Sequence, residues 1–172
     1  MRIDSKGIAL SAVSAALAVV LLIFGAYFET FDLSCLFLAS LCMMLPLYKK
    51  YYLGAFLAYI AASLLALLLT AGRFQVIIPF AMFFGLHAIV NELQLKFNVN
   101  KFLALLIKEV WFLGTLAVMY FFTKMFVADS ETLEKYMPYI IFIGGALFFP
   151  VYDYLIFRFK RMLDIVLKRL KI

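Results

Sequence analysis

Residues 8–28 read IALSAVSAALAVVLLIFGAYF, an apolar run without a single charge that follows the basic residues Arg2 and Lys6. A helix needs about 20 apolar residues to cross the hydrocarbon core of a bilayer, and this run meets that length. It is long for the apolar core of a signal peptide and lacks a convincing small-residue cleavage site. We therefore predict a retained transmembrane helix here.

Five further apolar runs follow, each separated from the next by a short polar break. We predict an all-α integral membrane protein with six transmembrane helices in residues 1–157 and a basic amphipathic helix in residues 158–172. The predicted spans after the first are residues 33–48, 52–71, 76–95, 102–127 and 137–157.

The composition supports this fold class. The chain is 67% hydrophobic and 15% charged, whereas a soluble domain is typically about 45–50% apolar and about 25% charged. This excludes a soluble domain, and with it a basic face that could bind nucleic acid. The two cysteines, Cys35 and Cys42, are seven residues apart inside an apolar run, which is not the spacing of a disulfide scaffold.

The distribution of basic residues predicts the orientation. With a cytoplasmic N-terminus, twelve basic residues fall inside and only Arg73, Lys124 and Lys135 fall outside, while Lys108 lies within a span. Cytoplasmic loops of membrane proteins carry the excess of Lys and Arg. We therefore predict a multi-pass protein of the cell membrane, surrounded by lipid, with both termini in the cytoplasm.

The first span carries a ridge of small residues, Ala9, Ala12 and Ala16, and small residues four apart let another helix approach closely. Together with the six-span layout and Asp32-Leu33-Ser34 at the start of the second span, this resembles an S component of an energy-coupling-factor (ECF) transporter. The resemblance implies an ECF S-component-like bundle that binds a vitamin or another small molecule. It also implies a transmembrane coupling subunit, docked on the alanine ridge, and ATPase subunits as partners. No motif marks a particular substrate.

Several ionisable side chains lie within the predicted spans, where their cost makes them candidates for function. His87 falls near the middle of its span, with Asn91 one turn further on the same face, and both are candidates for ligand binding or proton handling. The alternative is a histidine that only fixes helix packing. We predict that an intramembrane cluster joins His87, Glu92, Lys108, Glu109 and Asp153. The alternative there is that Lys108 snorkels to the interface.

The predicted outer ends of the helices carry a second group of candidates. Arg73 lies in a very short loop near several aromatic residues, which suits an anionic or polar ring-bearing ligand. The alternative is an aromatic belt at the membrane interface. The candidate ligand-binding residues here are Glu29, Asp32, Arg73, Gln75 and Tyr139.

An enzyme is not expected, because the chain has one histidine and no nucleophile–base or metal-ligand motif, and no cofactor or metal is predicted. Two alternatives to the S component stay open: a membrane scaffold that binds partner helices, and a secondary carrier with a proton path.

Overall fold

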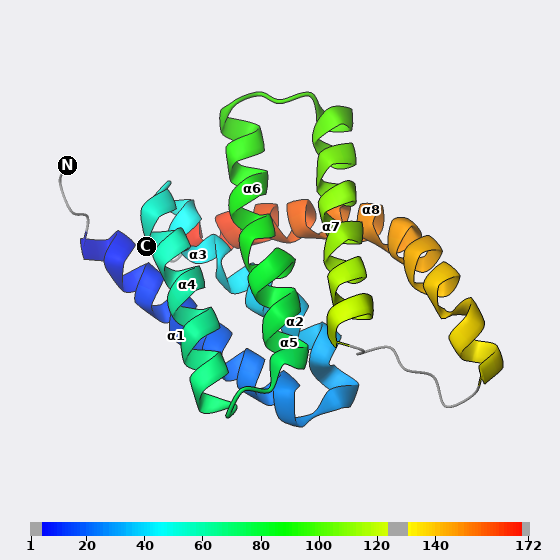
Figure 1. Ribbon diagram of the computed structural model, residues 1–172. Helices are drawn as coiled ribbons and strands as arrows, with labels where there is room; N and C mark the ends of the chain where they lie inside the picture. The colour runs from blue at the N-terminus through cyan, green and yellow to red at the C-terminus, as the bar shows by residue number, and fades with distance from the viewer. Residues whose placement is uncertain (1–4, 124–130, 170–172) are drawn as a thin grey trace.

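The computed structural model describes residues 5–123 and 131–169, and the regular structure within these ranges is helical (Figure 1). The longer helices are α1 (Ser5–Tyr27), α4 (Tyr52–Leu69), α6 (Gly85–Lys96), α7 (Lys101–Thr123) and α8 (Glu131–Arg169). Shorter elements join them: η1 (Glu29–Phe31), α2 (Asp32–Cys42), α3 (Met44–Tyr48), α5 (Phe74–Pro79) and the π-helical segment η2 (Phe80–Phe84).

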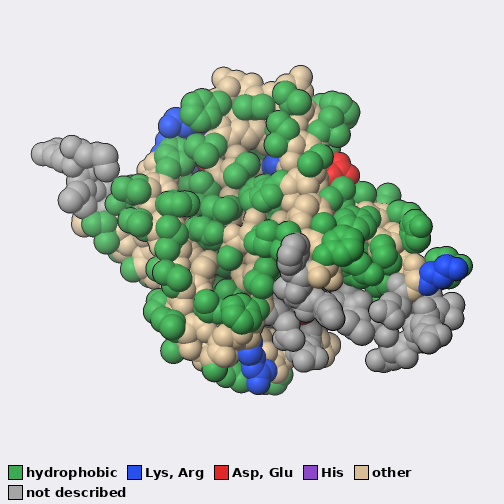
Figure 2. Space-filling view, in the orientation of Figure 1, with side chains coloured by type: hydrophobic (Ala, Val, Ile, Leu, Met, Phe, Trp, Pro, Cys, Tyr) green, Lys and Arg blue, Asp and Glu red, His purple; other side chains and the backbone are tan. Residues whose placement is uncertain are grey.

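Five helical stretches of the described chain are long and apolar enough to cross a membrane, which fits a membrane protein. They are residues 5–27, 52–69, 77–96, 101–121 and 135–169. Hydrophobic side chains cover most of the face seen in Figure 2, and the few charged side chains lie mainly near its margins. The alternation of polar breaks with apolar runs thus predicted the helical class correctly.

The predicted second span, residues 33–48, is not one continuous helix. The chain forms α2 and α3 with a turn at Met43 between them. Pro46 explains the break, because it has no amide hydrogen to donate to the carbonyl four residues earlier and its ring crowds that carbonyl. The Cys42 carbonyl loses its helical partner in this way, and the buried hydroxyl of Ser14 on α1 donates to it over 2.6 Å.

The first helices pack closely around α1, which lies against both α2 and α4. Gly54 on α4 allows this approach, because a β-carbon there would overlap the Tyr51 ring and the Ser11 hydroxyl. The core continues from the small side chains of α1 and α4, such as Ala18 and Ala62, into the aromatic side chains of η2.

A π-helical segment follows Pro79. The Tyr59 hydroxyl on α4 donates to the Ala81 carbonyl within this segment over 2.6 Å. Segments of this kind occur often at functional sites. Here η2 places Phe83 and Phe84 in the protein interior.

Helices α6 and α7 form an antiparallel hairpin, and α8 runs crosswise behind it in Figure 1. Asn100 begins α7, where its side-chain Oδ1 accepts the amide of Phe102 over 2.9 Å. Ion pairs described below join α8 to both helices of the hairpin.

The C-terminal part differs from the predicted boundary between residues 157 and 158. α8 continues without interruption from Glu131 to Arg169. In the C-terminal part of this helix Leu167 is buried and Leu163 is half-buried, whereas Phe159 and Val166 are exposed. Lys160, which pairs with Glu92 of α6, lies on the same side of the helix as Leu163 and Leu167.

Candidate functional site

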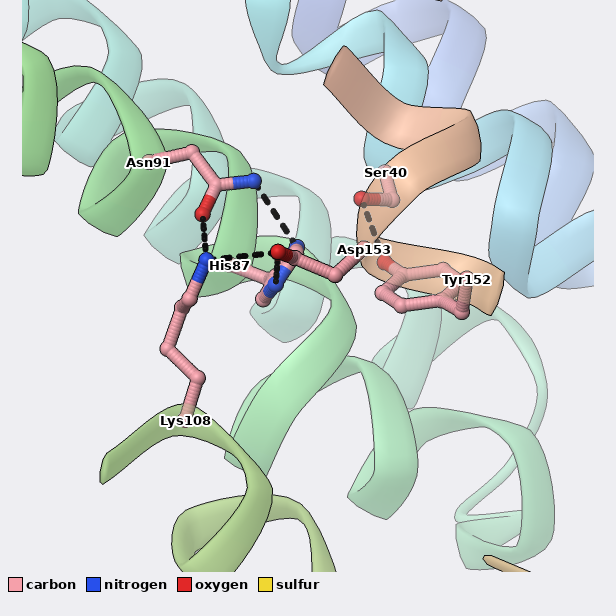
Figure 3. Close-up of polar contacts among 6 residues, drawn as sticks. All are labelled: Ser40, His87, Asn91, Lys108, Tyr152 and Asp153. Atoms are coloured by element: carbon pink, nitrogen blue, oxygen red, sulfur yellow. Dashed lines mark hydrogen bonds and ion pairs between the residues drawn. The ribbon is translucent and has the colours of Figure 1, made fainter. Parts of the chain in front are cut away.

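The two helices of the hairpin, α6 and α7, meet the crossing helix α8 at a buried ion pair. Lys108 on α7 donates from Nζ to Oδ1 of Asp153 on α8 over 2.6 Å (Figure 3). The same ammonium group donates to Oδ1 of Asn91 on α6 over 2.9 Å. Lys108 is only 2% exposed, so it lies within the protein and does not snorkel to the surface.

His87 completes this group. Its Nε2 lies 3.0 Å from Oδ1 of Asp153, and its Nδ1 lies 3.5 Å from Nδ2 of Asn91. A neutral imidazole with its proton on Nε2 satisfies both contacts, because a carboxylate only accepts and the Asn91 amide nitrogen only donates. We call His87, Asn91, Lys108 and Asp153 the polar cluster.

Aromatic rings enclose the polar cluster. The rings of Phe83, Phe149 and Tyr152 lie with their centroids 5.0, 5.8 and 5.0 Å from that of His87. The Tyr152 hydroxyl in turn lies 3.2 Å from the Ser40 hydroxyl on α2. A buried ion pair is costly unless other polar groups contact it, and Asn91 and His87 supply such contacts here.

Two residues predicted for this cluster lie elsewhere. Glu92 forms an ion pair with Lys160 of α8, and this pair is separate from the Lys108–Asp153 pair. Glu109 follows Lys108 on α7 and is half-buried, but the hydrogen bonds and ion pairs of the polar cluster do not include it. Glu92 directly follows Asn91 on α6, and Glu109 directly follows Lys108 on α7. Neighbouring residues of a helix point to different sides of it, so neither glutamate points toward the polar cluster.

A cavity of about 420 Å³ lies between α2, the C-terminal ends of α5 and η2, α7 and α8. Among the described residues that line it, Asp32 is the one with a charged side chain, and Thr115 adds a hydroxyl. The other lining residues are apolar: Leu33, Leu36, Pro79, Phe84, Phe112, Leu116, Met119, Ile140, Ile141, Gly144, Gly145 and Phe148.

The cavity lies next to the polar cluster, separated from it by aromatic side chains. Phe84 on the η2–α6 helix precedes His87 by one turn, and Phe112 on α7 follows Lys108 by one turn. On α8, Phe148 lies about one turn before Asp153. We call Phe84, Phe112 and Phe148 the aromatic floor of the cavity.

Arg73, one of the predicted outer residues, binds groups of α1. Its guanidinium donates to the Ala26 carbonyl over 3.1 Å and stacks 4.4 Å from the centre of the Tyr27 ring. Arg73 does not line the cavity, and Tyr139 is exposed. The side chains of Glu29 and Gln75 lie outside the described part of the structure.

Asp32 is therefore the candidate that the structure brings to a cavity. The sequence analysis did not single out Thr115, Gly144, Gly145 or the aromatic floor, because apolar and small residues are common in every span. The sequence feature that could have indicated the cavity is the Gly144-Gly145 pair, since two adjacent glycines within a helix leave room for another group.

The alanine ridge of α1 is on the molecular surface. Ala9, Ala12 and Ala16 are all exposed, so this side of α1 is not covered by the rest of the described chain. In residues 5–123 and 131–169 no group of three or more His, Cys, Asp or Glu side chains is arranged to hold a metal ion.

Comparison of the chain with family models, curated proteins and solved structures finds no match in any of the three.

Proposed function

We propose that this chain is a membrane protein that binds a small molecule in the cavity beside Asp32. The cavity carries the proposal, because its volume lies within the roughly 300–1,000 Å³ typical of ligand sites and its wall is largely apolar with a few polar groups. Asp32 begins α2 at the end that the positive-inside rule assigns to the outer face. A ligand would therefore enter from outside.

More particularly, the chain is proposed as the substrate-binding S component of an ECF-type uptake transporter in the cell membrane. Two features at opposite ends of the molecule support this role. The cavity offers a place for a substrate, and the exposed ridge of Ala9, Ala12 and Ala16 offers a close-packing surface for a coupling subunit. ATPase subunits would supply the energy for uptake.

A pair of glycine variants tests ligand binding. Gly144 lines the cavity and Gly114 does not, and a β-carbon at either position would meet no atom within 4 Å. Gly144→Phe should fill the cavity without disturbing the fold, and Gly114→Phe is the matched control.

Native mass spectrometry of the purified protein reports the outcome. We expect a co-purified small molecule on the wild type and on Gly114→Phe, and its absence from Gly144→Phe. A wild-type protein that carries no bound molecule, or one that survives Gly144→Phe, contradicts the proposal and favours a scaffold that binds only partner helices.

The polar cluster favours a second candidate, a secondary carrier with a proton path. His87, Lys108 and Asp153 are ionisable, buried and one turn beyond the aromatic floor, and carriers place proton-relay groups within the membrane in this way. Ligand-driven acidification of liposomes that contain the chain alone would support the carrier. Uptake that requires ATP and partner subunits would support the S component.

A further inference from the structure

Within the described part of the chain, Asp32 and Thr115 place polar side-chain groups in the wall of the cavity, and both act as hydrogen-bond acceptors. Asp32 is half-buried, and its Oδ1 accepts the Leu33 amide, which leaves Oδ2 available to a ligand. Thr115 is buried and donates its hydroxyl hydrogen to the Trp111 carbonyl over 3.1 Å. Its oxygen can then only accept a further hydrogen bond. A ligand matched to this wall must donate.

Two cationic side chains of the described residues, Arg73 and Lys108, bind other groups. Arg73 binds the Ala26 carbonyl and the Tyr27 ring, and Lys108 binds Asp153 and Asn91. Neither of these two side chains lines the cavity. A negative charge in a mostly apolar wall is costly without a partner, so a positively charged group on the ligand would gain most from Asp32.

The aromatic floor adds a second preference. The Phe112 and Phe148 ring centroids lie 6.1 Å apart with 31° between the planes, and Phe84 stands nearly perpendicular to Phe112 at 89°. Aromatic rings pack well against other rings in offset or edge-to-face geometry, and their faces attract cations. The floor thus suits a flat ring system.

We infer that the cavity selects a cationic ligand with an aromatic body, whose positive group contacts Asp32 and Thr115 and whose ring lies on the aromatic floor. This inference rests on the proposed function, because it assigns a ligand class to the same cavity. It also reverses the sign of the ligand expected from Arg73 alone.

Three naphthalene probes of matched shape test the charge. 1-Naphthylmethylamine is a cation, 1-naphthalenemethanol is neutral and 1-naphthoate is an anion. Isothermal titration calorimetry of the purified full chain in detergent, with empty micelles as the blank, measures the affinity of each. We expect the amine to bind at least about tenfold more tightly than the other two, since a hydrogen bond between two charged groups is stronger than one between neutral groups.

Two carboxylate variants assign the preference. Asp32→Asn keeps the shape of the side chain and should weaken amine binding by about tenfold, removing its advantage over the alcohol. Asp164→Asn on α8, which does not line the cavity, is the matched control and should bind the amine as the wild type does.

The glycine pair separates the two ways in which the idea can fail. If the alcohol or the acid binds as tightly as the amine, and Gly144→Phe still removes that binding, the ligand class is wrong and the proposed function stands. If Gly144→Phe removes no binding that Gly114→Phe retains, or no probe binds, the cavity is not a ligand site and both inferences are wrong.

Discussion

Lys108 and Asp153 are 45 residues apart in the sequence, and 2.6 Å separates Nζ of the lysine from Oδ1 of the aspartate. Both side chains are buried, Asn91 accepts a second hydrogen bond from Lys108, and His87 contacts the same Oδ1 of Asp153. This contact joins α7 to α8, and Asn91 extends it to α6. The stability of the three-helix region should therefore depend on it.

Lys108→Ala should destabilise the protein by about 3–5 kcal/mol, because it leaves the Asp153 carboxylate buried without its cation. Thermal unfolding in detergent, followed by the fluorescence of Trp111, the one tryptophan in the chain, measures the loss. The exposed Lys101→Ala is the control and should melt like the wild type. The double variant Lys108→Met with Asp153→Leu should recover at least half of the loss. Equal melting of the two alanine variants would refute the structural role of the pair.

Ser14→Ala should cost about 1–3 kcal/mol, because the Cys42 carbonyl that Pro46 leaves without a helical donor then has no partner. Ser63→Ala is the control, since the Ser63 hydroxyl only adds a bond within its own helix. Replacing Pro46 by alanine returns an amide donor, so Ser14→Ala should cost less in a Pro46→Ala background than alone. If the double-mutant cycle gives no coupling in unfolding free energy, this account of the α2–α3 break is wrong.

Gly54→Ala should lower the melting temperature, because the added methyl group would overlap the Tyr51 ring and the Ser11 hydroxyl where α1 meets α4. Gly114→Ala adds the same methyl group in open space and should be neutral or slightly stabilising, since alanine is the better helix former. A Gly54→Ala protein as stable as Gly114→Ala would show that the two helices adjust without strain.

Cysteine labelling in cells checks the predicted orientation. In a background without Cys35 and Cys42, an impermeant reagent should label Thr30→Cys from outside but not Val99→Cys or Lys168→Cys, and all three positions are exposed. The positive-inside rule is the reason for this pattern. Labelling of Lys168→Cys from outside would overturn the assignment of both termini to the cytoplasm.

Ala12→Trp should abolish co-purification of a coupling subunit while leaving ligand binding unchanged, because bulk on the ridge prevents close helix approach and the ridge does not line the cavity. Leu68→Trp, at a strongly exposed position of α4, is the control for a tryptophan on the lipid-facing surface. Normal assembly of Ala12→Trp, or the recovery of no partner with the wild type, contradicts the coupling role.

Much of the helical fold could be predicted because apolar runs and polar breaks report directly on helices in a membrane. The sequence analysis missed the break at Met43. Pro46 removes the helical donor of the Cys42 carbonyl, and the Ser14 hydroxyl that replaces this donor comes from another helix. The sequence analysis ended the last span at residue 157, because basic residues become frequent after it. The helix nevertheless continues, and one of these basic residues, Lys160, pairs with Glu92 of α6.

The candidate site was predictable in part. The sequence predicted one cluster that includes Lys108 and Asp153, and these two do meet. It also assigned Glu92 and Glu109 to that cluster, but position along a span does not say which way a side chain points around the helix axis. The cavity wall could not be predicted, because it depends on how four helices with ordinary apolar residues pack together.

The unbroken course of α8 has a mechanical consequence. Its 39 residues extend over about 58 Å at 1.5 Å per residue, roughly twice the thickness of the hydrocarbon core. Gly144, at the cavity, and Lys160, at the ion pair with Glu92, thus lie on one continuous helix, about 24 Å apart along its axis. Pro150 lies between them, where a helical hydrogen bond is missing, and α8 curves along its course in Figure 1. The chain thereby has a continuous helical connection, with one built-in bending point, between its proposed ligand site and the surface predicted to face the cytoplasm.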